Sequence, residues 1–170
     1  MSDDRAERFA RLYEASYGAI HAYASRRVGS HSADEIAAET FLVAWRKFDA
    51  LPSEPLPWLY GVARNVVSRH RRASGRQRQT EAALARERPW MPSERQYSGD
   101  PRLWDVWEQL GDTDREVLAR LAWEELAVAE AASVLGCSAP VFSVRLHRAR
   151  RRLERRLAAR PVSPVEPLEA

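Results

Sequence analysis

The chain has 170 residues, of which 45% are hydrophobic, so it can bury the core of one ordinary domain or of two small ones. Its net charge is only +3, but almost all of its basic residues are arginines, whose guanidinium groups suit paired hydrogen bonds to phosphates and bases. A single cysteine excludes an internal disulfide, and a charged N-terminus without any apolar run of about 18 residues predicts a cytoplasmic protein with neither signal peptide nor membrane span.

The first predicted element is one helix, or a pair of helices, over residues 5–28, because apolar and aromatic side chains recur there at helical spacing. We expect its tyrosines to lie in the core or at the core edge, and Gly29 to end it. The motif Ser32-Ala-Asp-Glu35 has the spacing of a capping box, which predicts the start of a second helix running to about Phe48.

The second predicted helix has two different faces. We expect Trp45 in the core, beside an inward stripe that consists of Ile36, Ala37, Phe41, Ala44 and Phe48. The outer face carries one leucine among charged residues, namely Glu35, Glu39, Leu42 and Arg46. An apolar side chain inside a polar rim is typical of a small protein interface, although a plain solvated surface is an open alternative because exposed leucines are common.

Three prolines between residues 51 and 57 predict a loop over 49–57, since proline removes a backbone donor that a continuing helix needs. A third helix is expected over 58–72. Its outward side can hold phosphates or meet a base edge through Arg64, Asn65, Ser68, Arg71 and Arg72. A charged track beside a shaped loop suits unstacked bases, and a solvated helix face is again the alternative.

Residues 73–102 turn polar and contain repeated Gly and Pro, which predicts a linker with room for a short helix over 80–88. A second capping-box motif, Thr113-Asp-Arg-Glu116, predicts a helix that starts there and ends near Trp123. Residues 161–170 are expected to form a disordered tail.

The segment over residues 127–160, between the helix that ends near Trp123 and the tail, is the most informative part of the chain. Residues 127–139 predict a short amphipathic helix that stops at Gly136, and Ser138 and Pro140 are start signals for a helix over 141–160. That last helix has an apolar stripe on one side and arginines on the other. A helix, a tight turn and a second helix together predict a helix-turn-helix.

In a helix-turn-helix, the N-terminal residues of the second helix meet the major groove. The predicted base readers are therefore Val141, Val144, Arg145 and Arg148, and Ser143 and Arg152 complete the predicted DNA-binding set. A solvated coiled-coil face is the alternative, but so many arginines on one helix repel each other unless phosphates approach them.

These elements predict an all-α protein of two small helical domains joined by an extended linker, the C-terminal domain being a helix-turn-helix. The expected boundaries are 1–72 for the first domain, 73–102 for the linker and 103–160 for the second domain. The four histidines lie apart and no glycine-rich phosphate loop occurs, so we predict no catalytic residue, no metal site and no cofactor.

The order of these segments resembles the extracytoplasmic-function sigma factors of bacterial RNA polymerase. The likeness covers about residues 8–158 and rests on the acidic helix with Phe41 and Trp45, WLYGVARNVVSRHRR, DREVL, and RLHRARRRL in the last helix. It implies that residues 1–72 bind and open the minus-ten element of a promoter and that residues 103–160 read the minus-thirty-five element.

The resemblance also implies partners. The outer face of the second helix, with Glu35, Glu39, Leu42 and Arg46, would dock on the clamp helices of the largest polymerase subunit, and the flap of the second-largest subunit would be a further contact. A loop that carries Asp49, Ser53 and Glu54 would hold a flipped promoter base, and residues 73–102 would thread toward the active-site channel. An anti-sigma factor is implied as an inhibitor.

Two other classes of protein stay open on the sequence. A dimeric helix-turn-helix repressor or activator would bind a palindromic duplex without entering the polymerase. A DNA-cleaving recombinase would need a nucleophile near an arginine cluster or a carboxylate-bound metal, and no such constellation is visible, so the chain is not expected to be an enzyme.

Overall fold

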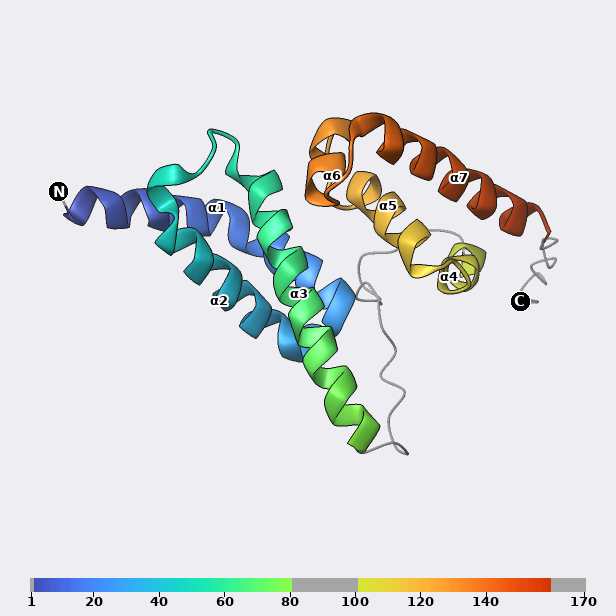
Figure 1. The fold of residues 1–170 in the computed structure, drawn as a ribbon, viewed down its shortest axis with the longest axis horizontal. Coiled ribbons are helices and arrows are strands. Elements are labelled where there is room, and N and C mark those ends of the chain that lie inside the picture. Colours follow the sequence, from blue (N-terminus) through green and yellow to red (C-terminus); the bar gives the residue numbers. More distant parts are fainter. Residues whose placement is uncertain (1, 81–100, 160–170) are drawn as a thin grey trace, which may run out of the picture.

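The structure is a computed structural model that describes residues 2–80 and 101–159, and every regular element in these ranges is helical (Figure 1). The elements are α1 (Ser2–Val28), α2 (Ser30–Arg46), the short 3-10 helix η1 (Phe48–Ala50), α3 (Pro55–Thr80), α4 (Pro101–Glu108), α5 (Asp112–Ala122), α6 (Val128–Val134) and α7 (Ala139–Ala158). We call α1–α3 the N-terminal domain and α4–α7 the C-terminal domain. The predicted all-α fold class is confirmed, and none of the described helices is long and apolar enough to cross a membrane.

The N-terminal domain is a three-helix unit in which α1 packs against both α2 and α3. Its core is formed by the apolar stripes that the sequence predicts, and its most deeply buried side chains include Ile20, Tyr23, Ile36, Leu59 and Val66. The three helices meet because each has one continuous apolar side that only a neighbouring helix can cover.

Both predicted capping boxes are wrong. Helix α2 begins at Ser30, directly after Gly29 with its positive φ of 80°, and has no side-chain cap, so Ser32 lies inside the first turn. Helix α5 begins at Asp112 after Gly111, and the Glu116 carboxylate does not return to the start of its own helix. It accepts hydrogen bonds from Arg27 and Arg120 instead. The spacing of a capping box does not reveal that a distant arginine competes for its glutamate.

The proline-rich segment forms a shorter loop than predicted. Helix α3 begins at Pro55, because backbone N–H groups in the first turn have no acceptor within the helix and a proline there loses nothing. It continues to Thr80, past the expected end at Arg72, and α4 begins at Pro101, so the described helices extend into both ends of the predicted linker. The short helix expected over 80–88, apart from Thr80, and the tail over 161–170 lie outside the described residues.

The C-terminal domain packs α7 against α4, α5 and α6. Phe142, Leu146 and Ala149 of α7 are buried at the centre of this packing, as the predicted apolar stripe requires. The turn between α6 and α7 passes through Gly136, whose φ is 66°, and Ser138 occupies the N-cap position of α7. Helices α6 and α7 therefore form the predicted helix-turn-helix.

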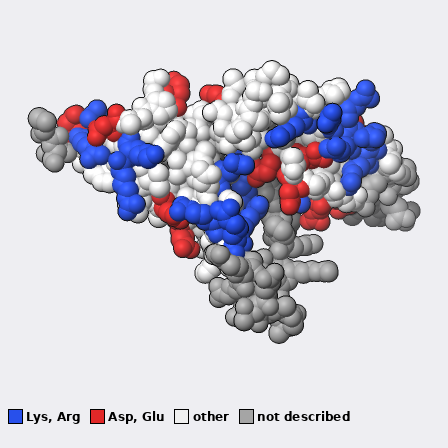
Figure 2. Space-filling view, viewed as in Figure 1, with Lys and Arg blue, Asp and Glu red and all other residues white. Residues whose placement is uncertain are grey.

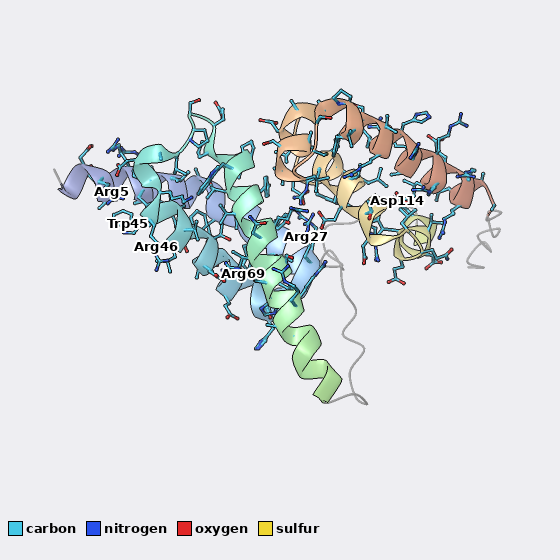
Figure 3. All side chains as sticks on the ribbon, viewed as in Figure 1. Arg5, Arg27, Trp45, Arg46, Arg69 and Asp114 are labelled. Atoms are coloured by element: carbon cyan, nitrogen blue, oxygen red, sulfur yellow. The ribbon has the colours of Figure 1, made fainter. Side chains whose placement is uncertain are left out.

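The two domains contact one another directly (Figure 1). Helix α3 lies against α6, and the C-terminal end of α1 reaches α5 and the turn that follows it. Arg27 pairs there with Glu116 of α5, and both Arg26 and Arg27 pair with Glu124 of the turn. Figure 3 shows Arg27 at this boundary.

The turn at Gly136 generates a stability prediction. No neighbouring atom lies within 4 Å of the position that a Cβ would take at Gly136, so only the positive φ opposes a side chain there. We expect Gly136→Ala to lower the free energy of unfolding by about 1 kcal/mol, because alanine is strained in the left-handed region. Urea unfolding followed by circular dichroism measures this change.

Gly18 provides the matched control, because it lies inside α1 with an equally open Cβ position and no positive φ. Gly18→Ala is expected to raise stability by about 0.5–1 kcal/mol. A stabilising Gly136→Ala would show that the turn does not hold its left-handed conformation in solution.

Candidate nucleic-acid and protein interfaces

The N-terminal half of α7 presents the predicted base-reading face to solvent. Val141 and Val144 are 43% and 50% exposed although they are apolar, and Arg145 and Arg148 are exposed beside them. The buried residues Phe142 and Leu146 fix the rotation of the helix about its axis, so this face cannot turn inward. Basic side chains gather along α7 in Figure 2, as a surface that meets phosphates requires.

Two other residues of the predicted DNA-binding set have partners within the protein. The Arg152 Nη1 atom donates to both carboxylate oxygens of Asp114 in α5, at 2.6 and 2.9 Å. The Ser143 hydroxyl donates to the Ala139 carbonyl oxygen at 2.9 Å. Arg152 thus ties α7 to α5, which a reading of α7 alone could not detect.

The outward face of α3 has the exposure that the sequence predicts. Arg64, Asn65, Ser68, Arg71 and Arg72 are all exposed, and Arg71 also donates from Nη2 to the Arg27 carbonyl oxygen at 2.8 Å. Arg64 and Asn65 are exposed within a hollow of the surface. They line a cleft whose opposite side belongs to the C-terminal domain and includes Glu130, Ser133 and Gly136.

The loop before α3 divides its predicted residues between two places. Asp49, Ser53 and Glu54 are all exposed. Glu54 lines the same cleft as Asn65, whereas Asp49 Oδ2 lies 3.5 Å from Arg5 Nε of α1. The structure therefore brings Glu54, but not Asp49, together with the α3 face.

The outer face of α2 is exposed as predicted. Leu42 is 47% exposed, Glu35 and Arg46 are exposed, and the partly buried Glu39 forms an ion pair with Arg69 of α3. Figure 3 shows Arg46 and Arg69 on this side of the molecule.

The expectation that Trp45 belongs to the core is wrong, since it is 36% exposed. Its ring packs edge-on against Phe9, with centroids 5.0 Å apart, and the Arg5 guanidinium lies 4.5 Å from its centroid. Leu42 and Trp45 are three residues apart on one helix, so they are neighbours on its surface. The apolar part of the α2 face is thus larger than the sequence suggested.

Sequence reasoning missed the residues at the boundary between the domains. Arg27 and Arg120 are both buried, and each continues an apolar stripe of its helix, four residues after Tyr23 and three after Val117. A charged residue at core spacing indicates a buried ion pair, because an isolated charge is not tolerated in a core. That signal was present in the sequence but did not identify the partner helix.

The described residues contain no group of three His, Cys, Asp or Glu side chains that could hold a metal ion. The one cysteine, Cys137, lies in the turn between α6 and α7 and is half-buried.

Comparison with protein families gives two matches. The family model described as Sigma-70 region 2 matches residues 12–77, and the model described as Sigma-70, region 4 matches residues 102–153. These ranges correspond to the N-terminal and the C-terminal domain, in that order along one chain.

Among curated proteins, the chain is 30% identical over 139 residues to a probable RNA polymerase sigma factor, RfaY, of Xanthomonas campestris pv. campestris. The match covers 76% of this chain and 35% of the relative, so the chain spans about a third of that protein's length.

Two solved structures are similar. One is the sigma factor RpoE in complex with the anti-sigma factor NepR from Bartonella quintana, with a TM-score of 0.71, 22% identity and coverage of 91% of this chain and 99% of that one. The other is CnrH in complex with the cytosolic domain of CnrY, with a TM-score of 0.59, 25% identity and coverage of 90% and 89%. At 22% identity, the first likeness concerns the fold alone.

The geometry of α7 predicts different roles for arginines along it. Arg145, near the start of α7, is expected to discriminate between bases by about 1–3 kcal/mol, whereas Arg155, near its end, should reach only phosphates. Alanine at Arg145 should therefore flatten the ranking of duplexes that differ in sequence. Alanine at Arg155 should weaken all of them about equally and reduce the salt dependence of binding.

Titration of the full chain against a small duplex library at two salt concentrations separates these effects. A changed ranking with Arg155→Ala and an unchanged ranking with Arg145→Ala would mean that α7 meets the groove in a different register.

Proposed function

Because the chain belongs to the sigma-70 family, as an extracytoplasmic-function type sigma factor, we propose that it binds core RNA polymerase and directs initiation at promoters that carry its minus-ten and minus-thirty-five elements. The observation that carries this proposal is the ordered match of region 2 and region 4 on one chain. The exposed faces of α2, α3 and α7 support it with surfaces of suitable chemistry.

The N-terminal domain has the proposed roles of docking and opening. Its α2 face, with Leu42 and Trp45 inside a charged rim of Glu35, Glu39 and Arg46, suits the clamp helices of the largest subunit. The α3 face offers arginines that can bind backbone phosphates and Asn65, which can bind a base edge. Glu54 lines the same cleft and is a candidate to contact a flipped base. These are the contacts that a melted minus-ten element would need.

The C-terminal domain has the proposed role of reading the minus-thirty-five element in duplex form. Val144 and Arg145 can contact a thymine methyl and a guanine edge, and the arginines that follow can hold phosphates. The flap of the second-largest subunit is a further proposed contact of this domain. The expected domain limits of 1–72 and 103–160 are kept as working boundaries, with the observation that α3 itself runs on to Thr80.

We further propose that the chain acts in the cytoplasm by binding rather than by catalysis, and that an anti-sigma factor inhibits it. One structural neighbour was solved in complex with such an inhibitor, which supports that choice of partner. The alternative of a dimeric repressor is not favoured, because a repressor has no need for a region 2 domain.

Run-off transcription tests the proposed function directly. Core polymerase mixed with the chain should transcribe from cognate promoters that core polymerase alone does not use. If no promoter in a genomic library gives a specific transcript, while the chain alone binds a palindromic duplex, the repressor alternative is correct.

The docking face yields a separate prediction. Leu42→Arg should abolish co-purification with core polymerase, because it places a charge in the apolar centre of the contact. The melting temperature should stay within a few degrees, since the position is half-exposed. Val144→Arg, which makes the same change at an exposed apolar position of α7, should retain the polymerase. Normal binding by Leu42→Arg would remove α2 from the interface.

The outward face of α3, with Arg64 and Asn65, yields another prediction. Asn65→Ala and Arg64→Ala should slow formation of the open promoter complex more than they weaken closed binding, because each extruded base costs a few kcal/mol that these contacts offset. Permanganate footprinting of thymines in the bubble measures this effect, with Arg11→Ala, at an exposed position of α1, as the control. Unchanged reactivity in both α3 variants would contradict the assignment.

A further inference from the structure

The C-terminal domain contains an apolar pocket of about 340 Å³ between α4, α5 and α7. Helices α4 and α5 both pack against α7, so the whole pocket belongs to one domain (Figure 1). Protein interiors hold few voids larger than a water molecule, and pockets for small ligands begin at about 300 Å³. Most of the wall consists of six apolar side chains, two from each helix: Leu103, Trp107, Leu118, Leu121, Leu146 and Leu153.

The wall combines deeply buried and partly exposed apolar side chains. Trp107 is 4% exposed, and its ring meets that of Trp123 edge-on with centroids 4.6 Å apart, which gives the pocket a rigid aromatic side. Leu103, Leu121 and Leu153 are only half-buried. An apolar ligand would therefore remove apolar surface from water on both partners, and each methylene that it buries should tighten binding about fourfold.

Of the described residues that line this pocket, only Arg150 is charged. It is exposed and has no ion-pair partner among the described residues. Two other arginines on α7 are bound within the protein, since Arg152 pairs with Asp114 and Arg156 donates to the Gln109 carbonyl oxygen. The guanidinium of Arg150 is thus available to a ligand, and its charge complements a carboxylate.

The volume of the pocket limits the size of its ligand. A water-sized group occupies about 30 Å³ in a liquid, so the pocket holds about eleven such groups. An unbranched acyl chain of about ten carbons has this size. One turn of an α-helix with its side chains takes up about 400 Å³, so a partner helix could insert single side chains only.

We propose that the pocket between α4, α5 and α7 binds the acyl chain of a free medium-chain carboxylic acid, with the carboxylate at Arg150. The apolar wall supplies most of the affinity, and Arg150 selects an anionic end over a neutral one. The site lies within the C-terminal domain and does not depend on the proposed function.

A chain-length series on the full wild-type chain tests the apolar part of this proposal. Calorimetric titration with hexanoate, octanoate and decanoate, each kept below its micelle-forming concentration, should show affinity rising about fourfold per methylene. Tetradecanoate should gain little over decanoate, because its last carbons exceed the volume of the pocket. Decanoate that carries a terminal bromine should quench tryptophan fluorescence, since Trp107 and Trp123 line the site.

A pocket-filling variant locates the site. Ala122 is an exposed residue that lines the pocket, so Ala122→Phe fills the space without removing a buried side chain. We expect it to weaken decanoate binding by about tenfold or more. Ala10→Phe, the same change at an exposed position of α1, should bind decanoate like wild type. Circular dichroism checks that both variants keep their helices, and the wild-type series decides the matter if one does not.

The role of Arg150 is tested with a neutral ligand. Arg150→Gln should weaken decanoate binding severalfold but leave the binding of decanol unchanged, because only the acid carries a charge. Arg151→Gln is the matched control, since Arg151 is the next residue of α7, is exposed and does not line the pocket. It should leave the affinity for both ligands unchanged.

Absence of decanoate binding, or binding that Ala122→Phe does not weaken, would overturn the proposed site. Equal losses for decanoate and decanol in Arg150→Gln would overturn the role of its charge. Co-sedimentation of the chain with phosphatidylglycerol vesicles, without binding of free decanoate, would mean that a membrane surface is the ligand and would also overturn the proposal.

Discussion

The arrangement of this protein depends on the need of buried charges for partners. Arg27 follows the core stripe of α1 and would be unacceptable there alone, and the carboxylates that neutralise it, Glu116 and Glu124, belong to the other domain. Their pairing places the end of α1 on α5, and this in turn sets α6 beside α3. The pairing of buried charges therefore helps to set how the two helical domains sit together.

This arrangement treats the three functional faces differently. The α2 face around Leu42 and the α7 face around Val144 point to solvent, so the docking and the duplex reading that we propose for them need no rearrangement. The α3 face with Asn65 looks into the cleft between the domains. The face that we propose for melted DNA therefore borders the C-terminal domain.

Sequence reasoning succeeded wherever the relevant contacts lie within one helix. The buried side of α7 with Phe142 and its exposed side with Arg145 follow from helical periodicity alone. It failed where a partner comes from elsewhere. Glu116 has the spacing of a capping box but pairs with Arg27, and Arg152 has the position of a phosphate contact but also holds Asp114. Trp45, expected in the core, instead lies at an exposed edge beside Arg5.

The most direct test of this account is a measurement of the distance between the two domains in solution. Spin labels at exposed positions of α3 and α7, in a chain whose Cys137 is replaced by serine, report that distance by pulsed electron resonance. The account predicts one short distance for the wild-type chain, and a longer distance when Glu116 is replaced by glutamine, because Arg27 then loses a charged partner in the other domain. A broad long distance in the wild-type chain, or an unchanged distance in the variant, would contradict it.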